Sequence, residues 1–344
     1  MEKGNSNVLI IYTGGTIGMI KDAGTGALKV FDFEHLTSHI PELGRLSIHL
    51  DSTSIQEPID STEMNPECWA EIAQTIFDNY AKYDGFVVLH GSDTMAYTAS
   101  ALSFMLEHLD KPVVLTGSQL PIGTIRTDGK ENFITSIEIA AAKDENGQSM
   151  LREVAIYFEY SLYRGNRTSK VSASLFEAFR SPNYPELAVA GVDINYRLPV
   201  YEPKQKELQL FTELNNQVAL MKVFPGFNMD LYESLFQVDR VKGIVIESFG
   251  SGNLPRNERF VETIRQYIHT GGIVLNITQC STGSVNQGKY ETSSFLEELG
   301  VVGGADLTTE AAITKLMYLI GKYPDISSRI RALKKSLVGE MTVN

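Results

Sequence analysis

The stretch Gly85-Phe-Val-Val-Leu-His-Gly-Ser-Asp-Thr-Met95 decides the fold of this chain. Residues 86–89 form an apolar run with the length of a buried strand, and Gly91 ends it. Beyond this glycine, apolar residues recur at helical spacing at Met95, Ala99, Leu102, Leu106 and Leu109. Ser92, Asp93 and Thr94 therefore lie where a strand turns into a helix. Open parallel α/β sheets bind ligands beyond the carboxyl ends of their strands, so these three residues are the first candidates for a site.

The composition is that of an ordinary globular protein and excludes two functional classes. The chain has 344 residues, long enough for two domains, with 43% hydrophobic and 21% charged residues. Its formal net charge of −12 leaves no strong basic face for a nucleic acid. The basic cluster between Arg329 and Lys335 is interpreted as the solvated face of a helix. No apolar run approaches the length that spans a membrane.

The cysteines and the N-terminal residues predict a reduced, cytoplasmic protein. Cys68 and Cys280 are far apart in sequence and form no CxxC motif, so no disulfide framework is expected. Residues 1–7 lead directly into the strand-like segment 8–11, which is too short for a signal peptide and lacks a cleavage pattern.

Strand-like and helix-like stretches alternate along the chain, which is typical of a parallel sheet built from βαβ units. Strands are expected at 7–12, 86–89, 112–115, 154–158, 244–246 and 273–277, and helices at 66–83, 95–109, 131–142, 258–269, 309–320 and 327–337. We predict a larger N-terminal α/β domain at residues 1–197, with a mainly parallel sheet flanked by helices. A linker at 198–217 and a smaller C-terminal α/β domain at 218–344 follow. The Gly-rich stretch 21–26 is expected to be a mobile lid.

Three predicted strand ends share glycines and hydroxyl groups: Thr13-Gly-Gly-Thr16, Gly91-Ser-Asp-Thr94 and Thr116-Gly-Ser118. Glycine allows the backbone to approach a ligand closely, and hydroxyl groups donate hydrogen bonds or act as nucleophiles. One such turn is commonly only a helix cap. Three of them at neighbouring strand ends predict a shared pocket.

Competing motifs do not fit. The first turn lacks the lysine of a P-loop, and the chain has no GxGxxG dinucleotide fingerprint. His35 and His39 have a ligand spacing, but Leu36 stands where a zinc protease needs glutamate, so no metal site is predicted. His90 is interpreted as structural. Without a Ser-His-Asp constellation, a hydroxyl nucleophile needs another activator, and Lys170 is a candidate.

Two segments carry a resemblance to a known family: Tyr12-Thr-Gly-Gly-Thr-Ile-Gly-Met19 and His90-Gly-Ser-Asp-Thr-Met-Ala-Tyr-Thr98. They resemble the signature segments of bacterial-type L-asparaginases, and the cytoplasmic type I branch is the closer match. The resemblance continues, in order, through Asp60-Ser61, Thr116–Gln119, Leu162–Thr168, Asn276–Cys280 and Gly303–Asp306, and so covers nearly the whole chain.

The resemblance implies hydrolysis of L-asparagine to L-aspartate and ammonia without a cofactor. Thr16 matches the usual nucleophile of the family, which forms an acyl-enzyme that water then hydrolyses. Ser92, Asp93 and Lys170 match the family's second catalytic group, and which hydroxyl attacks first stays open. The family also implies a homo-oligomer, either a dimer or a tetramer.

The substrate carries a carboxylate and an ammonium besides its amide, and this limits the roles of the site residues. Asp60, Ser61 and Thr62 are expected to bind it together with Ser92 and Asp93. Asp93 can pair with the ammonium, while backbone N–H groups near Ser61 and Ser92 can bind the carboxylate. We expect Lys170 to orient Ser92 and tune proton transfer through it.

The sequence departs from the family pattern at three places. Ser92 replaces the usual threonine, which keeps the hydroxyl but fixes its rotamer less firmly. A lid tyrosine found in many relatives is absent near Ala27. Glu247 stands where some type I enzymes use an arginine to bind an allosteric asparagine, although Thr278 and Cys280 match. The reversed charge predicts near-hyperbolic kinetics.

Three other functions stay open from the sequence. A glutaminase or mixed asparaginase-glutaminase differs by one methylene of substrate, worth only about 1–3 kcal/mol in a pocket. An ammonia-releasing amidotransferase subunit would carry an extra N-terminal domain. A silent amino-acid-binding protein is disfavoured because Thr16, Asp93 and Lys170 are all present. Asn253 either completes the pocket or belongs to a plain turn.

Overall fold

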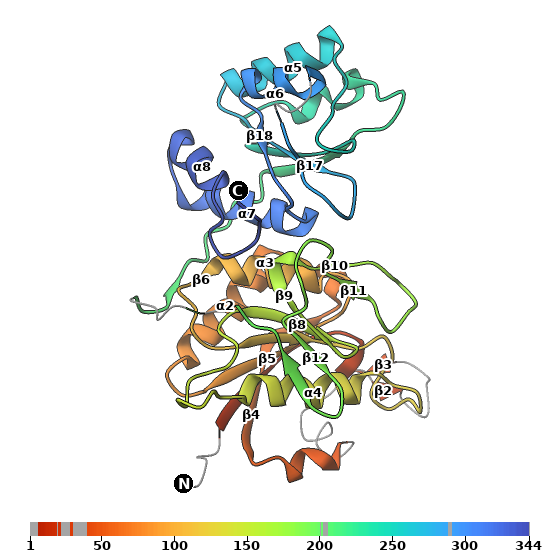
Figure 1. Cartoon of the computed structure of the whole chain (residues 1–344), viewed down its shortest axis with the longest axis vertical. Helices are drawn as coiled ribbons and strands as arrows, with labels where there is room; N and C mark the ends of the chain where they lie inside the picture. The colour runs from red at the N-terminus through yellow and green to blue at the C-terminus, as the bar shows by residue number, and fades with distance from the viewer. Residues whose placement is uncertain are drawn as a thin grey trace. The chain divides into compact units, whose positions relative to one another are not determined.

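The chain folds into two compact units, residues 1–212 and residues 213–344. They are drawn in Figure 1 from a computed structural model that describes residues 6–18, 20–21, 28–29, 40–199, 201, 206–287 and 291–343. The predicted lid at 21–26, apart from the backbone of Lys21, lies outside these residues. So do Ala27, His35 and His39.

An eight-stranded sheet forms the centre of the first unit, in the order β13-β12-β9-β8-β7-β5-β1-β4. The strands are β1 (Ser6–Gly14), β4 (Ile48–Ile59), β5 (Gly85–Leu89), β7 (Val113–Thr116), β8 (Val154–Phe158), β9 (Ser161–Arg164), β12 (Ala188–Ala190) and β13 (Ile194–Tyr196). Neighbouring strands from β4 to β8 pair in parallel, and β9, β12 and β13 add antiparallel pairs. The predicted mainly parallel sheet is confirmed.

Helices cover both faces of this sheet: α3 (Met95–Met105) lies on one side and α4 (Gly129–Ala141) on the other, while α2 (Pro66–Asn79) packs beside α3 and β4 (Figure 1). With both faces covered, every residue of β5 is buried. Alternate residues Val87 and Leu89 join the core cluster that contains Phe133 and Ile137 of α4. This double burial explains the continuous apolar run at 86–89.

Three predicted helices are shorter than expected, and the last of them, predicted at 327–337, ends at Leu333. α2 begins at Pro66 as predicted, with the Asn65 side chain accepting the backbone N–H of Cys68 at 3.0 Å, but it ends at Asn79. α3 ends at Met105, because Leu106–Glu107 forms the short strand β6, which pairs with β14 (Gln209–Leu210). The apolar periodicity at 106 and 109 therefore reflects burial rather than helix. β14 lies within the stretch 198–217 that was predicted to be a linker.

Short elements complete the first unit at the ends of its strands. They are η1 (Thr16–Gly18), β2 (Ile20–Lys21), β3 (Leu28–Lys29), η2 (Pro41–Arg45), η3 (Ser61–Glu63), η4 (Gly165–Arg167), β10 (Ser169–Lys170) and β11 (Phe179–Arg180). β4 was not predicted, since its sequence is mostly polar and exposed residues alternate along it. Its backbone pairs with β1 over seven consecutive residues, from Ile48 to Ser54.

The second unit contains a smaller, fully parallel sheet with the order β15-β16-β17-β18. Its elements are β15 (Val218–Lys222), η5 (Met229–Leu235), β16 (Gly243–Ser248), α5 (Glu258–His269), β17 (Ile273–Thr278), α6 (Glu291–Leu299), β18 (Val302–Gly303), α7 (Thr309–Lys322) and α8 (Ile326–Leu333). Ile244 and Val274 of the sheet pack with Phe260 and Ile264 of α5. The predicted smaller α/β domain is confirmed as a fold.

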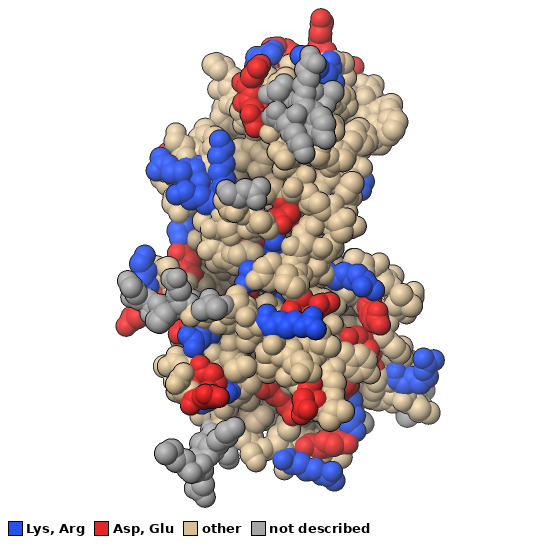
Figure 2. Space-filling model, in the orientation of Figure 1, with Lys and Arg blue, Asp and Glu red and all other residues tan. Residues whose placement is uncertain are grey.

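Basic side chains gather over α8 on the face shown in Figure 2, whereas acidic and basic side chains are interspersed elsewhere on that face. Arg329 of α8 also has an internal role, because it donates from Nε to the carbonyl oxygen of Tyr323 at 2.7 Å. No helix among the described residues is long and apolar enough to cross a membrane.

Candidate active site

The turn after β1 is pressed against the turn after β5. Gly15 has a φ of +86°, and a Cβ atom on it would overlap the backbone of Gly91. Only glycine allows both this left-handed conformation and this approach. The contact places η1, which begins at Thr16, beside the residues that lead into Ser92.

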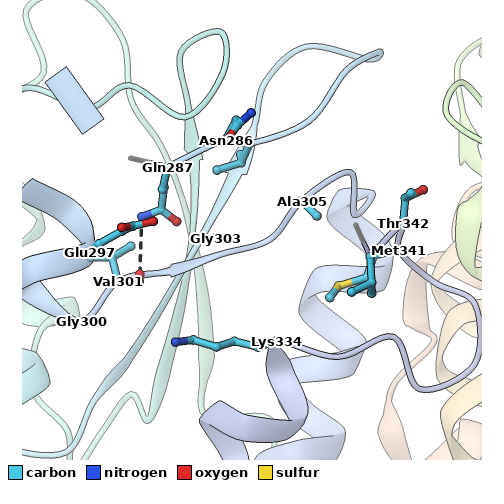
Figure 3. A pocket seen from close by; sticks show the side chains of 12 residues that line it. Asn286, Gln287, Glu297, Gly300, Val301, Gly303, Ala305, Lys334, Met341 and Thr342 are labelled. Atoms are coloured by element: carbon cyan, nitrogen blue, oxygen red, sulfur yellow. Dashed lines mark hydrogen bonds between the residues drawn. The ribbon is translucent and has the colours of Figure 1, made fainter. Parts of the chain in front are cut away.

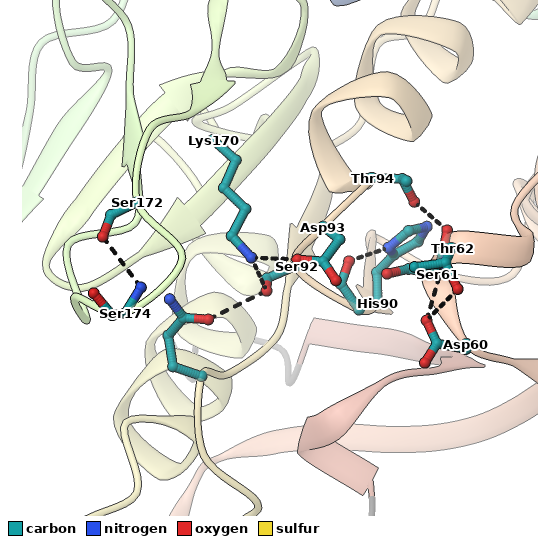
Figure 4. Close-up of polar contacts among 12 residues, drawn as sticks. Asp60, Ser61, Thr62, His90, Ser92, Asp93, Thr94, Lys170, Ser172 and Ser174 are labelled. Carbon is teal, nitrogen blue, oxygen red and sulfur yellow. Dashed lines mark hydrogen bonds and ion pairs between the residues drawn. The ribbon is translucent and has the colours of Figure 1, made fainter.

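The turn after β4 joins the same place. A Cβ on Gly91 would lie 2.5 Å from Oγ of Ser61, so the two residues are in direct contact. The hydroxyl of Thr94 donates to the carbonyl oxygen of Ser61 at 2.7 Å. Asp60 caps η3 by accepting from the backbone N–H and the hydroxyl of Thr62, each at 2.9 Å (Figure 4). Residues 60–62 are therefore held against the Gly91–Thr94 turn.

Lys170 links the two polar residues of that turn. Its Nζ donates to Oγ of Ser92 at 2.8 Å and to Oδ1 of Asp93 at 2.6 Å (Figure 4). The Lys170 side chain is 15% exposed and that of Asp93 61% exposed. The ammonium therefore sits below the surface, while the carboxylate stays open to a solute.

Ser92 has a second partner that the sequence did not indicate. Its hydroxyl donates to Oε1 of Gln119 at 3.3 Å, and Nε2 of Gln119 donates to the carbonyl oxygen of Leu175 at 2.9 Å. Gln119 follows β7, in the third Gly-hydroxyl turn. The predicted convergence of the three strand ends therefore takes the form of contacts through Gly15, Gly91 and Gln119.

Two further ring groups lie under the site. Tyr12 packs its phenol ring on Gly18 of η1, and burial raises the pKa of Tyr12 to about 12. His90 is fully buried, and its Nδ1 lies 2.7 Å from the carbonyl oxygen of Gly91. A carbonyl can only accept, so Nδ1 carries the proton and Nε2 accepts from the hydroxyl of Thr98 at 2.8 Å. Burial lowers the pKa of His90 to about 4.

Every residue predicted for the site that belongs to the first unit therefore lies in one of these linked turns or beside them. Ser92, Asp93 and Lys170 are in direct contact, and glycine contacts join the turns of Thr16 and Ser61 to theirs. Among the described residues, no group of three or more His, Cys, Asp or Glu side chains could hold a metal ion. A pocket of about 520 Å³ in the second unit, lined in part by Gln287, Glu297 and Lys334, contains none of the predicted site residues (Figure 3).

His90 predicts a specific pH dependence of stability. Its pKa is lower in the folded chain than the ordinary 6.5, so the unfolded chain takes up a proton first as the pH falls. The free energy of unfolding should decrease between about pH 6.5 and pH 4, by about 3 kcal/mol for a shift of this size. Urea unfolding at several pH values gives the free energy of unfolding as a function of pH. The slope of this free energy against pH should be shallower for His90→Gln, because glutamine cannot titrate. Equal slopes for the two proteins would contradict the assignment of a neutral His90.

Comparisons with known proteins identify the family of this chain. Residues 7–201 match the family model "Asparaginase, N-terminal", and residues 217–333 match "Glutaminase/Asparaginase C-terminal domain". L-asparaginase 1 of Escherichia coli K12 is 40% identical over 98% of each chain. The structure of L-asparaginase I from Vibrio cholerae has a TM-score of 0.89 at 37% identity, covering 98% of this chain and all of the other. The thermostable L-asparaginase of Thermococcus kodakarensis has the same TM-score and coverage at 30% identity. This chain belongs to the asparaginase family.

Proposed function

We propose that this chain hydrolyses L-asparagine to L-aspartate and ammonia, with Thr16 as nucleophile. The observation that carries the proposal is the position of Nζ of Lys170, 2.8 Å from Ser92 and 2.6 Å from Asp93. This pair of contacts lies in the turn against which the Thr16 turn is pressed. The names of the relatives at 40% and 37% identity agree with this substrate.

The substrate would be held at both charged groups of its α-carbon. The Asp93 carboxylate is 61% exposed and is contacted by Lys170 at Oδ1, so it can pair with the substrate ammonium. Backbone N–H groups near Ser61 and Ser92 are the donors proposed for the substrate carboxylate, with the Asp60–Thr62 turn held in place by the Asp60 cap. Fixing two points of a small amino acid leaves its side-chain amide in a defined position.

The chemistry then follows in two steps. The hydroxyl oxygen of Thr16 bonds to the amide carbon, the C–N bond breaks, and the departing nitrogen leaves as ammonia after taking up the hydroxyl proton. Water adds to the carbonyl carbon of the resulting ester, the bond between that carbon and the Thr16 oxygen breaks to release aspartate, and one proton of the water returns to the Thr16 oxygen. Ser92 and Lys170 would carry and orient the proton during these transfers. The phenol of Tyr12 lies beside η1 and stays protonated, so it can donate a hydrogen bond but not act as a base.

Glutamine remains the second candidate substrate because the match to the second unit is named for both glutaminases and asparaginases. Comparing kcat/KM for the two amides would rank them.

We also propose a homodimer or homotetramer in the cytoplasm, with domain boundaries at 1–197 and 218–344. Sedimentation of the purified protein would measure the assembly, and limited proteolysis would locate the boundary.

Replacing Thr16 by alanine tests the nucleophile. Thr16→Ala should lower kcat for ammonia release from asparagine by about 10³-fold or more, because no acyl-enzyme can form. Thr16→Ser keeps a hydroxyl at the same place and should retain most of the activity. Wild-type turnover by Thr16→Ala would show that another hydroxyl is the nucleophile.

Replacing Lys170 by methionine tests the contact with Ser92. Lys170→Met should lower kcat/KM by about 10²-fold or more, the range of a lost proton-transfer group. Lys143→Met is the matched control, since Lys143 also pairs with a carboxylate, that of Asp84 at 2.9 Å, just before the start of β5 and so at the opposite end of that strand from Ser92. Equal kcat/KM for wild type and Lys170→Met would refute the role given to Lys170.

The surroundings of Glu247 predict a velocity curve without strong cooperativity. Glu247 accepts from the Thr309 hydroxyl at 2.7 Å and pairs with Lys222 at 3.2 Å, so both carboxylate oxygens are engaged. A substrate carboxylate would meet negative charge where some relatives have arginine. Initial velocity against asparagine concentration should fit a hyperbola with a Hill coefficient near 1, and a strongly sigmoidal curve would contradict this.

A further inference from the structure

Asp128 lies at the start of α4, and its carboxylate binds the turn that carries Gln119. It is 5% exposed. Its Oδ2 accepts the backbone N–H of Gln119 at 2.8 Å, and its Oδ1 accepts the backbone N–H of Leu120 at 3.0 Å. One buried carboxylate therefore fixes two consecutive peptide groups. Hydrogen bonds to a charged acceptor are about twice as strong as neutral ones.

Two neighbouring residues form further hydrogen bonds to the same turn. The Thr127 hydroxyl donates to the carbonyl oxygen of Leu120 at 3.1 Å. Nδ2 of Asn132, which is fully buried, donates to the carbonyl oxygen of Gly117 at 3.0 Å and to Oδ2 of Asp128 at 3.3 Å. Its Oδ1 accepts the backbone N–H of Glu159 at 2.9 Å. Residues 117–120 are thus held through both N–H and C=O groups.

The turn so held presents one side chain to the site. Oε1 of Gln119 accepts the hydroxyl proton of Ser92, while Nε2 of Gln119 donates to the carbonyl oxygen of Leu175. The second bond decides which end of the amide faces Ser92. The Ser92 hydroxyl therefore has one acceptor, Gln119, and one donor, Lys170, and their directions set its orientation.

We propose that Asp128 is a positioning residue for the hydrolysis, acting through Gln119 on the hydroxyl of Ser92. This inference rests on the proposed function, since it concerns how Ser92 is oriented during that reaction. Loss of the Asp128 hydrogen bonds lets residues 118–120 move. The Ser92 hydroxyl can then turn away from the orientation in which it carries the proton. The Asp128 carboxylate accepts hydrogen bonds from Gln119, Leu120 and Asn132, whereas the groups proposed to bind substrate are Asp93 and backbone N–H groups near Ser61 and Ser92. The loss should therefore fall on kcat and spare KM.

Asp128→Asn is the direct test. The asparagine amide has only one oxygen, so its NH₂ group faces a backbone N–H, and one of the two peptide groups loses its acceptor. We expect kcat to fall about tenfold or more, with KM for asparagine within about twofold of wild type. Asp306→Asn is the matched control, because Asp306 of the second unit is also buried and accepts at both oxygens, from the backbone N–H of Thr342 at Oδ1 and from its hydroxyl at Oδ2, each at 2.7 Å. It should leave both constants unchanged.

A double-mutant cycle with Gln119→Met separates positioning from general destabilisation. Methionine keeps the length of Gln119 but removes the acceptor for Ser92. If Asp128 acts through Gln119, the second substitution adds no further loss. The kcat of the double variant should then lie within about twofold of the kcat of the less active single variant. Losses that multiply, or wild-type kcat in Asp128→Asn, would overturn the proposal. If Asp128→Asn does not fold, wild-type kcat in Gln119→Met alone would overturn it. A wild-type protein that releases no ammonia would instead contradict the proposed function itself.

Discussion

The site depends on a contact between backbones. Gly15 lies against Gly91, and Gly91 lies against Ser61, at distances where a Cβ atom would overlap its neighbour. Parallel pairing of β4, β1 and β5 brings the ends of these strands to one edge of the sheet, but pairing alone leaves the turns separated by whole side chains. Glycine at both positions lets the turns touch. The polar residues that follow, Thr16, Ser61 and Ser92, then fall within one small region.

Hydrogen bonds maintain what the glycine contacts make possible. Thr94 ties its turn to Ser61, and His90 ties the carbonyl group of Gly91 to Thr98 of α3, which in turn accepts from Nε1 of Trp69 at 2.9 Å. This second chain is buried, and each group in it has a partner of the right kind only if His90 is neutral. A protonated ring would place an N–H where Nε2 now accepts from Thr98. Burial lowers the pKa of His90 and so keeps the ring neutral, as these hydrogen bonds require.

Most of the fold could be predicted because the signals were local. The apolar run at 86–89 and the Asn65-Pro66 start of α2 each reported a structure formed within a few residues. β4 gave no such signal, since its polar residues form a strand only through pairing with β1. The extension of α3 to residue 109 was wrong for a related reason: β6 exists because β14, about a hundred residues later, pairs with it. Long-range pairing cannot be read from periodicity.

The site divides along the same line. Ser92 and Asp93 were marked by their place at a strand end, and Lys170 by the lack of a histidine activator and by the family resemblance. Gln119 was part of a quoted motif but received no role, and Asp128 received none, because neither position has a distinguishing pattern of its own. Asp128 lies in the Thr-Asp-Gly sequence at the start of α4. Its carboxylate binds the backbone N–H groups of Gln119 and Leu120, which lie in the turn after β7.

These added contacts explain how a serine at position 92 can keep its hydroxyl oriented. A threonine restricts its own hydroxyl because the methyl group limits rotation about χ1, whereas a serine samples more rotamers. Here the restriction comes from outside the side chain: Lys170 donates to Oγ at 2.8 Å and Gln119 accepts from it at 3.3 Å. Both partners are themselves held, Lys170 by Asp93 and Gln119 by Leu175 and the Asp128 carboxylate. The orientation of the Ser92 hydroxyl therefore depends more on neighbouring residues than the orientation of a threonine hydroxyl would.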